Sequence, residues 1–191
     1  MQFQVQIDDI LSSDAEKEEK KAVLKQLFQS FSGGFSDFDD TLTDEISLLY
    51  SKLKWLKRQG KSFDRAFLER HLHLHLGAVE ELRRAHISQL IIISRNDIQL
   101  LKLFSEMYGE RLKKEGIVLQ GVVGSLPTFS LTLQDKIDLL SAGSSWYLCD
   151  VFEWKRVTVV LPAICVESYS LQRLFKKYLY KLFYFSLFLL K

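Results

Sequence analysis

Hydrophobic positions along this chain follow two spacings, one typical of strands and one typical of helices. Residues 89–94 (QLIIIS) form a continuous apolar run that ends in a polar residue, which is the pattern of a strand buried on both faces. Residues 44–58 instead place apolar residues every three or four positions, with Lys and Arg between them, as on the two faces of a helix. The two patterns together predict a parallel sheet that is covered by helices.

The same patterns predict the order of elements along the chain. Strands are predicted at residues 2–7, where polar and apolar residues alternate, and at 35–38, 89–94, 117–123, 146–149 and 157–161. Helices are predicted at residues 14–31, 44–58, 63–76, 77–85, 96–112 and 135–141. Strands that alternate with helices indicate an α/β fold.

Composition excludes several classes of protein. Of the 191 residues, 47% are hydrophobic and 26% are charged, with 9 Gly and 2 Pro, so we expect a globular protein rather than a disordered or collagen-like one. Two cysteines, Cys149 and Cys165, cannot form a disulfide framework and show no CxxC spacing. The N-terminus has no basic stretch followed by an apolar one, so we expect no secretory signal and a cytoplasmic protein, with a location peripheral to a membrane as the alternative.

Charge is distributed unevenly along the chain. Residues 1–50 contain 11 acidic and 4 basic residues, whereas residues 51–191 contain 13 acidic and 22 basic ones. Such asymmetry is found in proteins that bind anionic ligands, nucleic acids or membrane surfaces, and by itself it does not choose among them.

Polar residues that follow the predicted strands suggest a site. Ligands of open α/β sheets bind at the carboxyl ends of the strands, where this chain has Asp37, Asp39, Ser94 and Asp150. Two carboxylates close together repel each other unless one is protonated or a cation lies between them. A Mg²⁺ ion held by Asp37 and Asp150 would remove that repulsion.

A phosphoryl group suits this arrangement. One carboxylate can attack phosphorus while its neighbour transfers a proton. The phosphoryl oxygens then need a hydroxyl donor, for which Ser94 and Thr41 are candidates, and a cationic side chain, for which Lys136 is the candidate.

Four segments carry a resemblance to a known family. They are FSDFDDTLT (35–43), LIIISRN (90–96), QDKIDLL (134–140) and WYLCDVFEW (146–154). In order and spacing they resemble the four motifs of the haloacid-dehalogenase-like (HAD) hydrolase superfamily, and the resemblance covers about residues 33–161. The fourth motif departs from the family pattern, because Cys149 stands where the family usually has Gly.

The resemblance implies a role for each of these residues. Asp37 would be the nucleophile that forms an aspartyl-phosphate, and Asp39 would be the general acid and base. Thr41 would brace the loop and belong to the phosphate-binding group, where Ser94 would bind the phosphoryl oxygens and Lys136 would neutralise them. Mg²⁺ would be bound by Asp37, the main-chain carbonyl of Asp39, and Asp150. The function implied is a magnesium-dependent phosphatase for a small phosphorylated metabolite, and we expect no nucleic-acid partner.

The resemblance also implies a domain organisation. The core would be a doubly wound, mostly parallel, Rossmann-like sheet formed by residues 33–43 and 87–167. Residues 44–86 would form a small helical cap insert, and residues 1–32 a strand and helix that precede the core. Residues 168–191 form a predicted amphipathic helix, which would pack on the sheet, lie on a membrane surface, or bind a partner or a second copy of the chain.

Other interpretations of the same residues stay open at this point. The chain could be a phosphotransferase, a glycosyltransferase that binds a nucleotide sugar through its DxD, or a degenerate family member that acts as a binding module. The DFDDT segment and Ser94 could simply cap the helices that follow them. His71 and His75 would share one face of the predicted helix 63–76, but no acid or Cys nearby completes a metal site.

Overall fold

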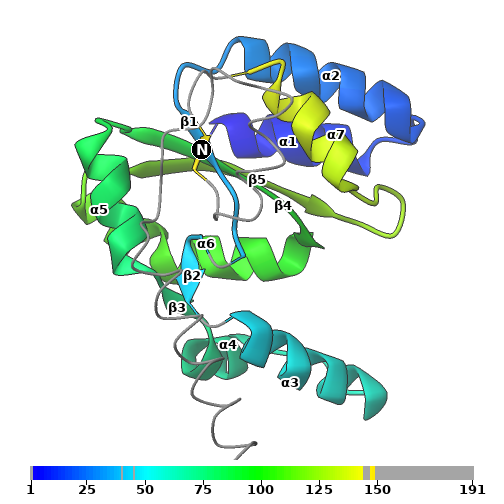
Figure 1. Ribbon diagram of the computed structural model, residues 1–191. Helices are drawn as coiled ribbons and strands as arrows, with labels where there is room; N and C mark the ends of the chain where they lie inside the picture. The colour runs from blue at the N-terminus through cyan, green and yellow to red at the C-terminus, as the bar shows by residue number, and fades with distance from the viewer. Residues whose placement is uncertain (1, 40, 45, 144–146, 149–191) are drawn as a thin grey trace, which may run out of the picture.

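The computed structural model describes residues 2–39, 41–44, 46–143 and 147–148 (Figure 1). Asp150, both cysteines, the predicted strand 157–161 and the predicted helix 168–191 lie outside these residues. Among the helices that are described, none combines the length and apolarity needed to cross a bilayer.

A parallel four-stranded sheet forms the centre of the molecule. Its strands are β1 (Gly34–Ser36), β4 (Gln89–Asp97), β5 (Val118–Ser125) and β6 (Tyr147–Leu148), in the order β5-β4-β1-β6. Phe35 of β1 is in register with Ile91 of β4 on one side and with Tyr147 of β6 on the other. The strands predicted at 35–38, 89–94, 117–123 and 146–149 are therefore present, with bounds shifted by up to three residues.

The strand order reverses at β1. The chain runs from β1 outward through β4 to β5 and then returns to the opposite side of β1 as β6. This connectivity is consistent with a Rossmann-like α/β fold. The carboxyl ends of β1 and β6 meet where the order reverses, which is the usual place for a ligand in such sheets.

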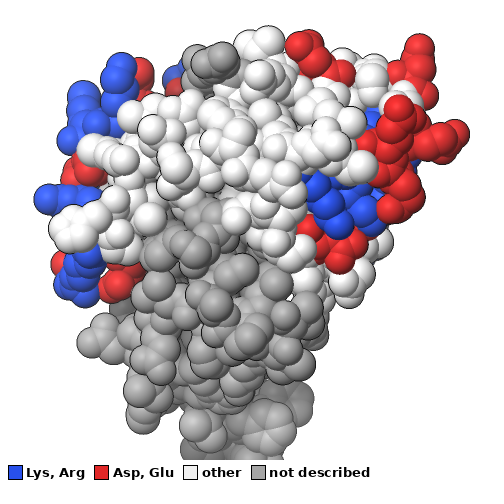
Figure 2. Space-filling view, turned by 90° about the horizontal axis from the view of Figure 1, so that it is seen from above, with Lys and Arg blue, Asp and Glu red and all other residues white. Residues whose placement is uncertain are grey.

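Helices cover both faces of the sheet (Figure 1). On one face lie α1 (Gln2–Ser12), α2 (Lys17–Gln29) and α7 (Leu133–Leu140), where α1 packs on β5 and α2 packs on α7. On the other face α6 (Ile98–Lys114) packs on β4 and β5, with α5 (Leu76–Arg84) beside it. Figure 2, which views the molecule from above, shows acidic and basic side chains together at two edges with uncharged residues between them.

The strand predicted at residues 2–7 is wrong, because these residues belong to helix α1. Ile7 and Leu11 are buried, and Phe3 and Ile10 pack against the same core, whereas Val5 is 61% exposed. Apolar residues at positions 3, 7, 10 and 11 fit one face of a helix, and this face covers β5. The Gln4 side chain accepts a hydrogen bond from the Val122 N–H of β5 at 2.7 Å.

The strand β1 is fixed by aromatic packing. Phe35 contacts Phe28 and Phe31, with ring centroids 5.1 and 5.4 Å apart, and Phe3 of α1 contacts Phe31. Leu90 to Ile93 of β4 are completely buried beside β1. The apolar run in the sequence therefore forms the centre of the core, as predicted.

Between β1 and α5 the chain forms an insert, whereas α5, which the predicted cap 44–86 also included, lies beside α6. The insert contains β2 (Thr43–Asp44), α3 (Ile46–Arg58), α4 (Arg65–His71) and β3 (His73–Leu74), and β2 pairs antiparallel with β3. In Figure 1, α3 and α4 lie away from the sheet, beyond α6 and the β2–β3 pair.

The helix predicted at residues 63–76 ends earlier than expected. Leu72 and Leu74 are buried and His73 is exposed, so the side chains alternate as in a strand. His75 then caps α5, because its Nδ1 accepts a hydrogen bond from the Ala78 N–H at 3.0 Å. His71 and His75 therefore do not share a helix face.

Candidate functional site

A buried ion pair lies at the carboxyl end of β1. Asp37 directly follows β1, and its N–H donates to the Leu148 carbonyl of β6 at 2.8 Å. Lys136 Nζ, from α7, lies 2.6 Å from Asp37 Oδ1. Asp37 is 6% exposed and Lys136 is 2% exposed. The fold thus brings together two of the residues that the sequence singled out, although α7 is distant from β1 along the chain.

Asp39 is held by two side chains from different elements. Tyr50 of α3 donates its hydroxyl to Asp39 Oδ1 at 2.6 Å, and Asn96 of β4 donates its amide N–H to the same oxygen at 2.5 Å. The Tyr50 hydroxyl also contacts Asn96 Oδ1. A carboxylate from the loop after β1, a phenol from the insert and an amide from β4 therefore meet at one point.

The Tyr50 phenol keeps its proton in this environment. Burial raises the pKa of Tyr50 well above its usual range, and the negative charge and hydrogen bond of Asp39 raise it further. The charge of Asp37 acts in the same direction. Both carboxylates therefore lie close enough to raise the pKa of the Tyr50 hydroxyl.

Ser94 lies beside Asn96 at the end of β4. It is 1% exposed, and its Oγ accepts hydrogen bonds from the main-chain N–H and the side-chain amide of Asn96, at 3.2 and 2.9 Å. The alternative that Ser94 caps the next helix is wrong, because the cap of α6 is Asp97, whose side chain accepts from the Gln99 N–H at 2.8 Å. Ser94 thus belongs to the group around Asp39.

The loop after β1 is braced by hydroxyl groups. Thr43 Oγ1 donates to the Phe38 carbonyl at 3.0 Å, and Ser36 Oγ donates to the Asp37 carbonyl at 2.8 Å. Thr43, two positions after Thr41, therefore braces this loop. Thr41 is completely buried, and within the described part of the chain its Oγ1 has no hydrogen-bond partner.

The predicted metal ligands are only partly described. Asp37 and Asp39 lie in the site, whereas Asp150 is outside the described residues. Within residues 2–143, apart from the gaps at 40 and 45, no group of three or more His, Cys, Asp or Glu side chains is placed to hold a metal ion. Carboxylate and carbonyl oxygens of the kind that Asp37 and Asp39 offer are the donors that Mg²⁺ prefers.

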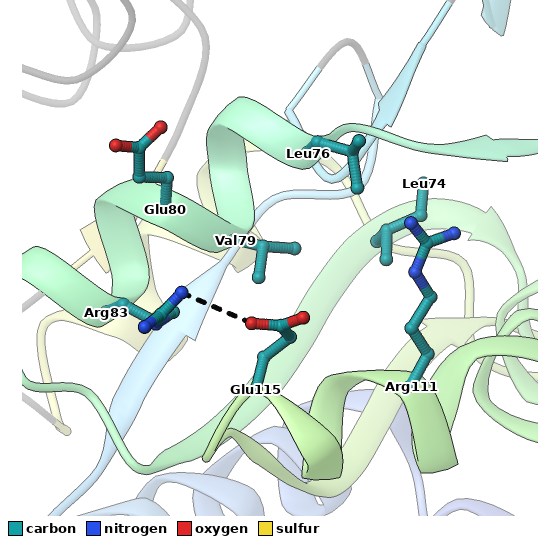
Figure 3. A pocket seen from close by; sticks show the side chains of 7 residues that line it. All are labelled: Leu74, Leu76, Val79, Glu80, Arg83, Arg111 and Glu115. Carbon is teal, nitrogen blue, oxygen red and sulfur yellow. Dashed lines mark hydrogen bonds and ion pairs between the residues drawn. The ribbon is translucent and has the colours of Figure 1, made fainter.

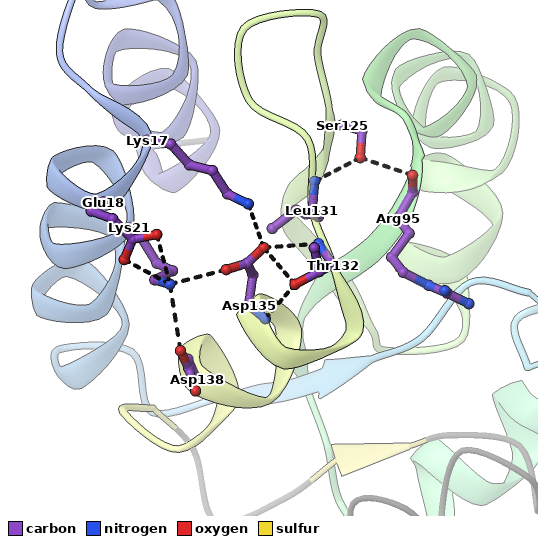
Figure 4. A network of polar contacts seen from close by, with 9 residues as sticks. All are labelled: Lys17, Glu18, Lys21, Arg95, Ser125, Leu131, Thr132, Asp135 and Asp138. Carbon is purple, nitrogen blue, oxygen red and sulfur yellow. Dashed lines mark hydrogen bonds and ion pairs between the residues drawn. The ribbon is translucent and has the colours of Figure 1, made fainter.

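A second ionic network fixes α7, the helix that carries Lys136 (Figure 4). Asp135 accepts hydrogen bonds from Lys17 at 2.6 Å and Lys21 at 2.9 Å, both on α2, and forms a capping box with Thr132. Burial alone would raise the pKa of Asp135, but the bonds from Lys17, Thr132 and Lys21 hold it well below its usual range. The network ties α2 to α7 next to Lys136.

Sequence reasoning missed Tyr50, Asn96, Lys17 and Lys21. Asn96 could have been found, because it lies two positions after Ser94 and alternate residues of a strand share a face. Lys17 and Lys21 are four positions apart on a predicted helix, which places them on one face. No signal in the sequence links Tyr50 to Asp39.

A separate pocket lies between α5 and α6 (Figure 3). It encloses about 240 Å³ and is lined by Leu74, Leu76, Val79, Glu80, Arg83, Arg111 and Glu115. Arg83 and Glu115 form an ion pair of 3.3 Å across it. None of the predicted site residues lines this pocket, so we place it outside the candidate site.

Comparison of the chain with protein-family models, with curated proteins and with solved structures gives no significant match.

Proposed function

We propose that the protein is a magnesium-dependent phosphomonoester hydrolase that acts on a small phosphorylated metabolite through an aspartyl-phosphate. The observation that carries this proposal is the buried contact of 2.6 Å between Lys136 and Asp37, at the point where the strand order reverses. A second carboxylate, Asp39, lies two residues away and is held by donors from two other elements. Candidates for a nucleophile, a cation and a proton-transfer group thus lie together at the carboxyl ends of the strands.

Two chemical steps follow from these roles. In the first, an oxygen of Asp37 attacks phosphorus, the bond between phosphorus and the ester oxygen breaks, and Asp39, in its protonated form, gives its proton to the departing alkoxide. In the second, water attacks phosphorus, Asp39 accepts a proton from that water, and the bond to Asp37 breaks to release phosphate. Each step uses Asp39 once, and the pair of steps returns both carboxylates to their starting state.

Charge on the phosphoryl oxygens is balanced by donors that the fold supplies. Lys136 lies next to the nucleophile, so its ammonium group can neutralise charge that develops during the transfer. Ser94 is buried in the same group. The Thr41 hydroxyl is buried without a partner in the described chain, and a phosphoryl oxygen would give it an acceptor.

The oxygen donors at the site are of the kind that bind Mg²⁺. Asp37, the carbonyl of Asp39 and Asp150 would hold the ion, and when bound it supplies positive charge opposite the phosphoryl oxygens. The roles of Asp37 as nucleophile and of Lys136 as the neutralising cation are proposed from their own contact and do not depend on the ion.

The insert takes the role of a cap in this proposal. Its helix α3 brings Tyr50 to Asp39, so the segment between β1 and α5 reaches the carboxylate pair. The alternative of a glycosyltransferase is less well supported, because it gives no role to the contact between Lys136 and Asp37.

Hydrolysis of a panel of phosphate monoesters in the presence of Mg²⁺ tests the function. The wild-type protein should release phosphate, and Asp37→Asn should abolish release while leaving the circular dichroism spectrum unchanged. Asp9→Asn, the same change on the exposed side of α1, is the matched control and should keep full activity. A quenched reaction should also contain phosphoprotein that hydroxylamine cleaves, and its absence in an active wild-type protein would exclude an aspartyl-phosphate.

A further inference from the structure

Tyr50 connects the insert directly to the candidate acid of the site. Its ring lies on α3, and its hydroxyl reaches Asp39 Oδ1 at 2.6 Å, outside its own element. The phenol has one proton and lies against two acceptor oxygens, Asp39 Oδ1 and Asn96 Oδ1. We place the phenol proton on the bond to Asp39 Oδ1, which leaves Oδ2 to carry the proton that Asp39 gives to the leaving group.

Asn96 gives Asp39 Oδ1 its second donor. The Asn96 amide is itself fixed, because it also donates to Ser94 Oγ at 2.9 Å. Two donors on one carboxylate oxygen, from α3 and from β4, restrict rotation of the carboxylate plane. The position of the other oxygen, Oδ2, is set by the same two bonds.

We propose that Tyr50 is a positioning residue, which orients the Asp39 carboxyl group for proton transfer to the leaving group. This inference rests on the proposed function, and it adds a task for the insert that no motif in the sequence indicates. Tyr50 itself acts through Asp39. Proton transfer to the leaving group then depends on contact between α3 and the loop after β1.

The dependence on the leaving group distinguishes positioning from a merely structural role. An alkyl phosphate needs a proton on its departing oxygen, whereas 4-nitrophenyl phosphate has a leaving group that departs as a stable anion. A defect in orienting Asp39 should therefore slow the alkyl ester much more than the nitrophenyl ester. A general loss of folded protein would slow both equally.

Tyr50→Phe removes the hydroxyl and keeps the ring. With the full-length chain and Mg²⁺, kcat for an alkyl phosphate should fall about tenfold or more, while kcat for 4-nitrophenyl phosphate should fall less than threefold, with KM little changed for both. The matched control is Tyr108→Phe, because Tyr108 also joins the core to the insert region, donating to the Leu72 carbonyl at 2.6 Å, but does not contact Asp39. This control should change the two activities by the same factor.

The outcomes separate failure of the inference from failure of the proposed function. If wild type hydrolyses neither ester and forms no phosphoprotein, the proposed function fails. If wild type is active and Tyr50→Phe changes both esters by the same factor, or raises KM alone, Tyr50 does not position Asp39 and the inference is overturned. Should Tyr50→Phe not fold, Asn96→Ala removes the other donor to Asp39 Oδ1 and must show the same selective loss on the alkyl ester.

Discussion

Lys136 Nζ lies 2.6 Å from Asp37 Oδ1, and the two side chains are almost fully buried. A buried charge that loses its partner is costly, so Lys136→Met should lower the free energy of unfolding by about 3 kcal/mol. Adding Asp37→Asn should recover a large part of that loss, because both charges are then absent. Urea denaturation of the two single variants and the double variant gives the coupling energy.

A control for this cycle is provided by Lys113. Its Nζ lies 3.8 Å from Glu110 Oε1, and both side chains are mostly exposed. Lys113→Met should change the free energy of unfolding by less than about 0.5 kcal/mol. If Lys113→Met and Lys136→Met lowered the free energy of unfolding equally, the ion pair at Asp37 would stabilise the protein no more than a surface pair does.

Asp135 provides a prediction about pH. Asp135→Asn removes the charge that Lys17 and Lys21 share, so it should cost about 2 kcal/mol at pH 7. The folded pKa of Asp135 lies below its ordinary value of about 3.9, so its contribution is complete above that pH and is lost as the pH falls through the folded pKa. The difference in the free energy of unfolding between wild type and Asp135→Asn should therefore become smaller below about pH 4.

Chemical denaturation at pH 7, 5 and 3 measures this difference. Glu110→Gln, which affects only the long contact with Lys113, should give a difference close to zero at every pH. A loss in Asp135→Asn that stays constant down to pH 3 would contradict the assigned role of the charge.

Substitution of glycine by alanine should have opposite effects on stability at two positions, 124 and 109. A Cβ on Gly124 of β5 would lie 2.8 Å from the Asn96 carbonyl oxygen and from the Ile98 Cα, both of which are backbone atoms. Gly124→Ala should therefore destabilise the protein by about 1–3 kcal/mol, since the end of β4 must move. Gly109→Ala, inside α6 with open space around it, should stabilise by about 0.5–1 kcal/mol. Thermal unfolding of both variants tests the pair.

The N-terminal helix predicts a contrast between two neighbouring apolar residues. Ile7 is completely buried and Val5 is 61% exposed, although in a strand both would face the same side. Ile7→Ala should cost about 2–4 kcal/mol, and Val5→Ala should change stability by less than about 0.5 kcal/mol. Similar losses in both variants would favour the strand that the alternating sequence predicts.

Secondary structure could be predicted from the sequence where the spacing of apolar residues favours one kind of element. The apolar run within 89–94 is short and rich in Ile, which favours a buried strand over a buried helix, and β4 lies there. Residues 2–7 were ambiguous, because polar and apolar residues alternate while the positions 3, 7, 10 and 11 also fit a helix. Packing on β5 decides for the helix, and such packing between distant segments is not encoded in a short window.

For the candidate site, strand ends were the useful signal. They led to Asp37, Asp39 and Ser94, which the fold places at the carboxyl ends of β1 and β4. Tyr50 could not be found in this way, because a tyrosine on an amphipathic helix usually packs in the core. Only the path of the chain through the insert brings its hydroxyl to Asp39.

The insert leaves and rejoins the core through β2 and β3, and Thr43 in the first is paired with Leu74 in the second. Both ends of the segment are thus anchored side by side, so its length is not constrained by any distance that it must span. A shorter or longer segment could be exchanged between these two anchor points without a change in the four-stranded sheet. What would be lost with the exchange is the phenol beside Asp39, so the replacement would have to supply its own donor.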